Sequence, residues 1–66
     1  VDAGSTLTVW LNGSELSSII GDGTEKTLAF TSDSAENLLR FKCKGTGGAE
    51  LYAFRRYAGG ARIFVR

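Results

Sequence analysis

One aromatic side chain and its neighbours have the chemistry to bind a sugar. Trp10 alternates onto the polar side of its segment, between Thr8 and Asn12. An exposed indole can stack on a pyranose ring, while the hydroxyl and the amide can hydrogen-bond to sugar hydroxyls. The alternative interpretation is that Trp10 belongs to the core, with both faces of its strand covered. Tyr57, close to the turn at Gly59-Gly60, is a second stacking candidate with the same two interpretations.

A second group of candidate binding residues is basic. Arg40, Lys42 and Lys44 recur at every second position, and Arg55 lies in the next segment. A row of cations on a small β-barrel can bind single-stranded nucleic acid when aromatic side chains lie among the cations. In the hairpin register described below, the aromatic side chains face away from this row. The formal net charge of +1 also differs from the strongly basic balance of most nucleic-acid-binding domains. Nucleic-acid binding is therefore the alternative function.

The chain lacks most of the side chains on which catalysis depends. It contains no histidine and one cysteine, and its acidic residues are scattered near turns. Cys43 alternates onto the apolar side beside Phe41, which predicts a buried and unreactive thiol. A single cysteine without histidine also makes a poor zinc site. We therefore predict a protein that is not an enzyme and that holds no cofactor and no metal ion.

Turn residues divide the chain into six segments of β-strand character. Short strands at roughly ten-residue spacing, separated by Gly-rich turns, are typical of a sandwich or a small barrel. The predicted fold class is all-β, a small antiparallel β-sandwich or jelly-roll-like domain of about six strands. It forms a single domain over residues 1–66, with residues 1–5 as a loose lead-in. The expected strands span residues 6–12, 16–20, 26–31, 37–44, 50–57 and 61–66. The expected turns are Asn12-Gly13, Gly21-Asp22-Gly23, Ser32-Asp33-Ser34, Gly45-Thr46-Gly47-Gly48 and Gly59-Gly60.

Residues 37–57 predict a β-hairpin. Two alternating runs flank the link from Gly45 to Gly48, which is the pattern of a hairpin with a four-residue loop. With Lys44 opposite Ala49, one face of the hairpin is apolar and aromatic, and the other carries the cations with Leu38, Leu51 and Ala53 between them. We therefore expect the two runs to be neighbours in one sheet.

The size and the charge distribution of the chain favour association with other chains. A domain of 66 residues buries only about 60% of the surface that its unfolded chain exposes. Small domains therefore usually need a disulfide, a metal or a partner subunit. Residues 1–39 are mainly acidic and residues 40–66 are mainly basic, so the two halves can pair within a sheet or between subunits. We expect a homo-oligomer, or contacts with other segments of a parent protein, since the chain begins at Val1 and not at Met.

No apolar run approaches the roughly 20 residues that a membrane-spanning helix needs, and there is no signal-peptide pattern. We therefore expect no membrane partner.

The order of the segments resembles the later strands of jelly-roll domains. The residues that carry the resemblance are TLTVWLNG, KTLAFTS, NLLRFKCKG and AELYAFRR, within residues 6–57. This family includes carbohydrate-binding modules and the β-sandwich tips of phage tail fibres. A complete jelly roll has about eight strands, so the chain is shorter than the family pattern. The closing stretch, Phe54 to Tyr57, also lacks the acidic element that often binds calcium or sugar in those modules, so no such ligand can be transferred to it.

The resemblance implies an attachment or carbohydrate-recognition domain within a larger extracellular or virion assembly. On this prediction, Trp10, Thr8, Asn12 and Tyr57 bind the glycan, and Trp10→Ala abolishes binding while the fold stays intact. Two alternatives remain open. One is a self-assembly domain without a ligand, and the other is a small β-barrel that binds nucleic acid through Arg40, Lys42, Lys44 and Arg55.

Overall fold

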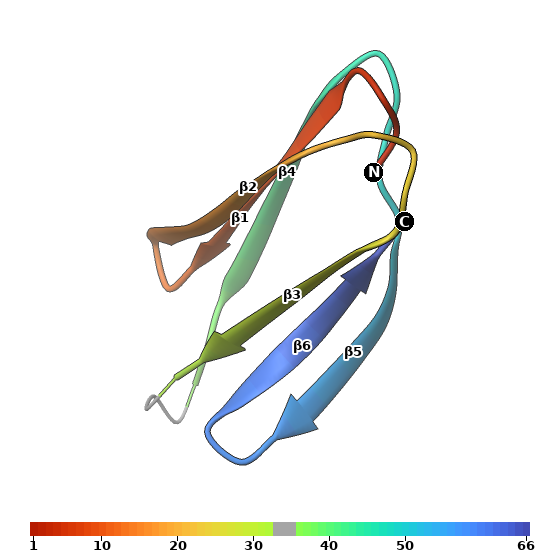
Figure 1. Cartoon of the computed structure of the whole chain (residues 1–66). Helices are drawn as coiled ribbons and strands as arrows, with labels where there is room; N and C mark the ends of the chain where they lie inside the picture. Colours follow the sequence, from red (N-terminus) through yellow and green to blue (C-terminus); the bar gives the residue numbers. More distant parts are fainter. Residues whose placement is uncertain (33–35) are drawn as a thin grey trace.

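The computed structural model describes residues 1–32 and 36–66, which form two layers of antiparallel strands (Figure 1). The strands are β1 (Ser5–Leu11), β2 (Ser14–Ile20), β3 (Lys26–Thr31), β4 (Leu39–Gly45), β5 (Leu51–Tyr57) and β6 (Gly60–Val65). One sheet has the order β2-β1-β4 and the other has the order β3-β6-β5. The predicted all-β sandwich of six strands is therefore confirmed, and the observed strand bounds lie within two residues of the expected ones.

The hairpin between β1 and β2 closes through the predicted Asn12-Gly13 turn. Both residues have positive φ, 51° and 85° respectively. A two-residue turn of this kind matches the right-handed twist of the flanking strands, and Asn and Gly are the residues that adopt positive φ most easily. Local sequence alone therefore dictates this hairpin.

The link between β2 and β3 is organised by Asp22. Its carboxylate accepts hydrogen bonds from the hydroxyl and the backbone N–H of Thr24, and from the ammonium group of Lys26. These bonds, the hydroxyl bond foremost, hold the pKa of the Asp22 carboxyl well below its usual value. The predicted turn at Gly21-Asp22-Gly23 is therefore present. The predicted turn at Ser32-Asp33-Ser34 lies largely outside the described residues.

The predicted hairpin between β4 and β5 is wrong. β4 pairs with β1, and β5 pairs with β6. The Gly-rich link between β4 and β5 passes from one sheet to the other because it is hydrogen-bonded to the N-terminal segment. Gly47 N–H donates to Ser5 Oγ at 2.9 Å, and Gly48 N–H donates to Asp2 Oδ2 at 2.9 Å. A Gly-rich link can cross between two sheets as easily as it can form a tight hairpin turn. The local sequence pattern therefore could not distinguish these two connections.

The first five residues are part of the domain, in contrast to the expected loose lead-in. Val1 is 1% exposed, and its amino group donates to Thr24 O at 3.2 Å. Asp2 N–H donates to Gly48 O at 2.9 Å. The N-terminal segment thereby ties together the two links that connect the sheets at this end of the molecule (Figure 1).

The hydrophobic core lies between the two central strands, β1 and β6. Its most buried side chains are Val1, Leu7, Val9, Phe30, Ala61, Ile63 and Val65. Along β1 and β6 burial alternates with a period of two, as expected for strands with one face on the core.

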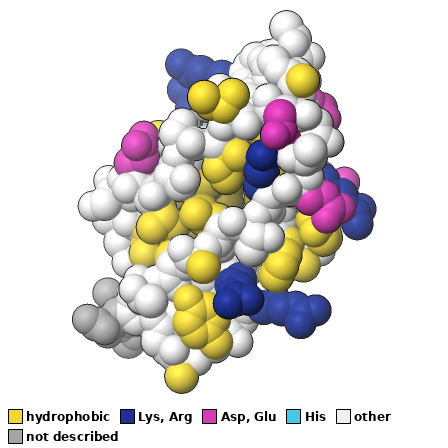
Figure 2. All heavy atoms as spheres, viewed as in Figure 1, with side chains coloured by type: hydrophobic (Ala, Val, Ile, Leu, Met, Phe, Trp, Pro, Cys, Tyr) yellow, Lys and Arg dark blue, Asp and Glu magenta, His cyan; other side chains and the backbone are white. Residues whose placement is uncertain are grey.

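Burial decreases towards the edge strands β4 and β5. Phe41 remains 39% exposed, Phe54 46% and Leu51 50%. Figure 2 shows hydrophobic side chains at the surface in several patches, with basic groups beside them.

Candidate functional site

The outer face of the sheet β2-β1-β4 carries a polar and basic surface, which we call the Trp10 face. In the register of β1 with β4, Trp10 lies opposite Arg40, Thr8 opposite Lys42, and Thr6 opposite Lys44. Alternate residues of a strand point to the same side, so the three cations and the three β1 side chains share one surface. With Glu15 of β2 they line a shallow hollow of about 250 Å³.

Trp10 lies at one end of this face and is half-buried. The guanidinium carbon of Arg40 lies 5.0 Å from the centroid of the indole ring, which is a cation–π arrangement. Trp10 and Arg40 also line a second hollow of about 140 Å³, together with Gly13 and Leu38. The indole therefore lines two hollows on the surface and is not one of the buried core side chains.

The basic row on β4 has no acidic partner within the described residues. The ion pairs found there are Lys26–Asp22 and Arg66–Glu25, and neither involves β4. Successive cations of the row are two residues apart, or about 6.8 Å along the strand. A regular row of unpaired cations is a surface that attracts a linear anionic polymer.

The pairing of β4 with β1 brings an aromatic side chain to the cations that the predicted hairpin did not place there, while Phe41 of β4 faces away from them as expected. In the predicted hairpin register, the aromatics faced away from the cations of β4. In the structure, Trp10 lies on the same face as Arg40, Lys42 and Lys44, because its strand is the neighbour of β4. The structure thereby brings one of the two predicted stacking residues together with three of the four predicted polyanion-binding residues.

Three predicted site residues lie elsewhere. Asn12 occupies the β1–β2 turn, where its Oδ1 accepts from Leu38 N–H at 2.8 Å and its Nδ2 donates to Asn37 Oδ1 at 3.0 Å. Tyr57 lies in β5 of the other sheet and donates to Phe30 O at 3.0 Å. Arg55 also lies in β5, and is described below.

Two residues of the Trp10 face were missed by sequence reasoning. Thr6 belongs to the same alternation as Thr8 and Trp10, so the period of two was sufficient to find it. Glu15 reaches the face because it pairs with Trp10 after an irregularity in the register between Val9 and Trp10. A β-bulge of this kind leaves no clear signal in the sequence.

The outer face of the other sheet has a different arrangement of cations, and we call it the Tyr52 face. The Arg66 guanidinium lies 4.1 Å from the Tyr52 ring centroid, and the Arg55 guanidinium lies 5.9 Å from that of Phe64. Tyr52 donates its hydroxyl proton to Glu25 at 2.9 Å, and Arg66 Nε lies 3.3 Å from the same carboxylate. The hydrogen bond to Glu25 raises the pKa of Tyr52, because deprotonation would break it beside a carboxylate.

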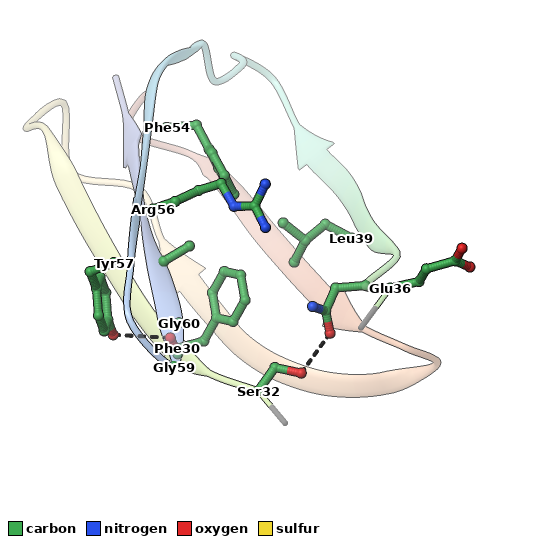
Figure 3. Close-up of a pocket in the computed structure, with 11 residues that line it drawn as sticks. Phe30, Ser32, Glu36, Leu39, Phe54, Arg56, Tyr57, Gly59 and Gly60 are labelled. Atoms are coloured by element: carbon green, nitrogen blue, oxygen red, sulfur yellow. Dashed lines mark hydrogen bonds between the residues drawn. The ribbon is translucent and has the colours of Figure 1, made fainter. Parts of the chain in front are cut away.

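A cleft of about 680 Å³ opens between the free edges of β4 and β5 (Figure 3). Its wall is apolar where Phe30, Leu39 and Phe54 meet, and its rim is polar. Figure 3 shows Arg56 reaching from β5 into this cleft. Sequence reasoning did not identify the cleft, because it depends on two strands that belong to different sheets.

The single cysteine is exposed, which corrects the prediction of a buried thiol. Cys43 does lie on the core side of β4, opposite Leu7. Because β4 is an edge strand, its core side is only partly covered by the other sheet. The alternation along β4 therefore correctly predicted the side of the strand on which Cys43 lies. It could not predict how much of that side the other sheet covers.

Within residues 1–32 and 36–66, no three His, Cys, Asp or Glu side chains gather in a way that could hold a metal ion. The same part of the chain has no helix with the length and apolar character needed to cross a membrane. Comparison with known proteins gave no significant match to a family model, a curated protein or a solved structure.

Proposed function

We propose that the chain is a non-enzymatic attachment domain that recognises an acidic polysaccharide through the Trp10 face. The observation that supports this proposal most strongly is the position of Trp10. It lies at the end of a row of three cations that have no acidic partner within the described residues. An aromatic ring and a row of charges on one flat surface match a polymer that has both sugar rings and regularly spaced anionic groups.

The indole, the cations and the threonine hydroxyls of the Trp10 face each have a role in this interaction. The indole stacks on a pyranose ring beside Arg40, and the two hollows that it lines receive the neighbouring units. Arg40, Lys42 and Lys44 bind carboxylate or sulfate groups along the polymer. The hydroxyls of Thr6 and Thr8 lie between the cations and β2, where they can hydrogen-bond to sugar hydroxyls.

The proposed setting is a larger extracellular or virion assembly, in which the chain associates with copies of itself or with other segments of its parent protein. The edge strands support this part of the proposal. Phe41 in β4 is 39% exposed and Leu51 in β5 is 50% exposed. Apolar side chains that remain exposed beside an unpaired strand edge favour contact with a neighbouring chain.

The test is a titration of the fluorescence of Trp10, the only tryptophan of the chain. We expect alginate, a polyuronate, to change the emission at low salt, and we expect rising salt to weaken this binding. Dextran, a neutral polysaccharide, serves as the matched ligand and should bind at least about tenfold more weakly, which corresponds to about 1.4 kcal/mol. Equal binding of both polymers would contradict the role of the cations.

The variant Trp10→Ala tests the role of the indole, with calorimetry as the readout since the fluorophore is lost. We expect it to abolish alginate binding and to leave the far-ultraviolet circular dichroism of the sheets unchanged, because Trp10 is outside the core. Trp10→Phe keeps an aromatic ring and should retain part of the affinity. Unchanged binding by Trp10→Ala would overturn the assignment.

Single-stranded nucleic acid is the second candidate ligand, and the shared face of Trp10 and the β4 cations favours it. Bases stack on aromatic side chains while a basic groove follows the phosphates. An oligothymidylate titrated under the same conditions separates the candidates. Tighter binding of the oligonucleotide than of alginate, at equal salt, would replace the polysaccharide with nucleic acid as the ligand of this face.

A further inference from the structure

We infer that the cleft between β4 and β5 binds a small amphiphilic anion, with an apolar body and a carboxylate at one end. The cleft lies between the sheets, whereas the Trp10 face lies on the outside of one sheet. The two sites share none of their described lining residues, so this inference is independent of the proposed polysaccharide site.

The size and the wall of the cleft suit a small molecule. Its volume of about 680 Å³ falls within the roughly 300–1,000 Å³ of typical ligand pockets. Phe54 and Leu39 contribute apolar surface to the cleft, and the largely buried Phe30 and Ala61 also line it, so the lining comes from four different strands. Phe54 is 46% exposed, so its ring is available for contact with the apolar body of a ligand.

Arg56 is the unusual residue of this cleft. It pairs with Ala61, a buried residue of β6, whereas its neighbour Arg55 pairs with Arg62 on the outer face. Arg56 therefore occupies a position on the core side of β5, where alternation favours an apolar side chain. Figure 3 shows its guanidinium group directed into the cleft between Phe54 and Leu39.

The guanidinium group of Arg56 has no carboxylate partner within the described residues. Glu36 is the acidic side chain among the lining residues, and Figure 3 shows its carboxylate directed away from the cleft. Arg56 is exposed, so its charge is solvated and accessible to a dissolved anion. A carboxylate can accept two parallel hydrogen bonds from it, because the guanidinium fork matches carboxylate geometry.

The wall beside Arg56 is held in place by contacts within the protein. Tyr57 donates to Phe30 O at 3.0 Å, across the sheet from β5 to β3. Gly60 lies beneath this contact, and a Cβ atom there would lie 2.1 Å from Phe30 O and 2.9 Å from the Tyr57 hydroxyl. Ser32 Oγ lies 2.6 Å from Asn37 Oδ1 at the opposite rim. These polar groups are bonded to one another and hold the shape of the cleft, so Arg56 is the residue that would bind the carboxylate of a ligand.

The test compares octanoate with octanol, which have the same chain length and differ in the anionic group. Both are titrated into the full chain and followed by amide chemical shifts. We expect octanoate to shift the amide signals of Gly59 and Gly60, which line the cleft, and to leave the Trp10 indole signal unchanged. Octanol should bind at least about tenfold more weakly. Equal affinities, or shifts centred on Trp10, would overturn the inference.

Two arginine variants that remove the same charge from adjacent positions of β5 provide the second test. Arg56→Gln should weaken octanoate binding at least about tenfold, whereas Arg55→Gln should change it less than about twofold, because Arg55 faces the other side of the sheet. Equal losses would assign the binding to overall charge and overturn the inference.

A second copy of the chain could close the cleft instead of a ligand. Light scattering would then show a dimer, and octanoate would neither bind to this dimer nor dissociate it. This result would also overturn the inference. Trp10→Ala separates this site from the proposed function, since it should leave octanoate binding unchanged.

Discussion

On the outer face of β2-β1-β4, the side chains of Arg40, Lys42 and Lys44 have no acidic partner within the described residues. On the outer face of β3-β6-β5, Arg66 is bonded to Glu25 and lies over Tyr52, and Arg55 lies over Phe64. Both faces are basic and aromatic in composition. They differ because Arg66 of the Tyr52 face is bonded to a carboxylate, whereas on the Trp10 face Arg40 lies over the indole and Lys42 and Lys44 have no acidic partner within the described residues. The number of cations on a face therefore does not identify a binding surface. The contacts that each cation makes within the protein are more informative.

The largest expected effect comes from breaking the contact that places β4 beside β1. Gly45 has a φ of 121°, and a Cβ atom there would lie 2.1 Å from Gly4 O. Gly45→Ala should therefore lower the free energy of unfolding by about 3 kcal/mol or more. The measurement is urea unfolding followed by circular dichroism.

Gly48→Ala is the matched control, because a Cβ atom at Gly48 meets nothing within 4 Å. Its stability should change by no more than about 0.5 kcal/mol. If both variants were equally stable, the close approach of β4 to the N-terminal segment would not determine where β4 pairs.

The second prediction concerns binding and compares the cations of the two faces. The double variant Lys42→Gln with Lys44→Gln should weaken alginate binding at least about tenfold, because two unpaired cations are removed from the row. The double variant Arg55→Gln with Arg62→Gln removes the same charge from the Tyr52 face and should change binding less than about twofold. Equal losses, measured by calorimetry at low salt, would show that net charge alone controls binding.

The third prediction compares two of the three cation–π contacts found in the described residues. Arg40 lies 5.0 Å from the Trp10 centroid, and Arg55 lies 5.9 Å from that of Phe64. Indole attracts cations more strongly than a phenyl ring, so Arg40→Gln should cost about 0.5–1 kcal/mol of stability and Arg55→Gln less. Chemical unfolding of both variants measures this difference, and the reverse order would contradict the geometry.

The smallest effect is expected in the titration of Tyr52. In the variant Tyr57→Phe, Tyr52 is the remaining tyrosine, and its pKa should lie above the ordinary value of 10.0 because of the hydrogen bond to Glu25. The folded state raises this pKa, so the bond stabilises the fold below pH 10 and the contribution is lost as the pH rises through the raised value. Absorbance titration measures the midpoint.

Glu25→Ala should return the pKa of Tyr52 towards 10.0, whereas Glu15→Ala on the Trp10 face should leave it unchanged. A midpoint that did not respond to Glu25→Ala would contradict the described contact.

Much of the fold could be predicted from local patterns, whereas the pairing of its strands could not. Six alternating segments indicated six strands, and Asn12-Gly13 indicated the hairpin that the structure contains. These features depend on residues close in the chain, because alternation and positive φ are local properties. The predicted pairing of β4 with β5 was wrong because it depended on a Gly-rich link that several conformations satisfy.

The candidate site was predicted in parts. Trp10 and Thr8 were placed on an outward face, and Arg40, Lys42 and Lys44 were placed on one side of their strand, which the structure bears out. Their union on one surface was not predicted, since it requires β1 and β4 to be neighbours. The cleft at Arg56 was missed for the same reason, as its lining comes from four strands in two sheets.

The sequence by itself determined which side chains of each strand share a side, because the backbone of a β-strand turns successive residues to opposite faces. Only the tertiary structure decided which strands lie next to each other. That choice rests on burial between β1 and β6, and on hydrogen bonds that Asp2 and Ser5 accept from a link more than forty residues later in the chain. These contacts made Trp10 the neighbour of the basic row, and they left Cys43 and Arg56 beside the open edge of the core.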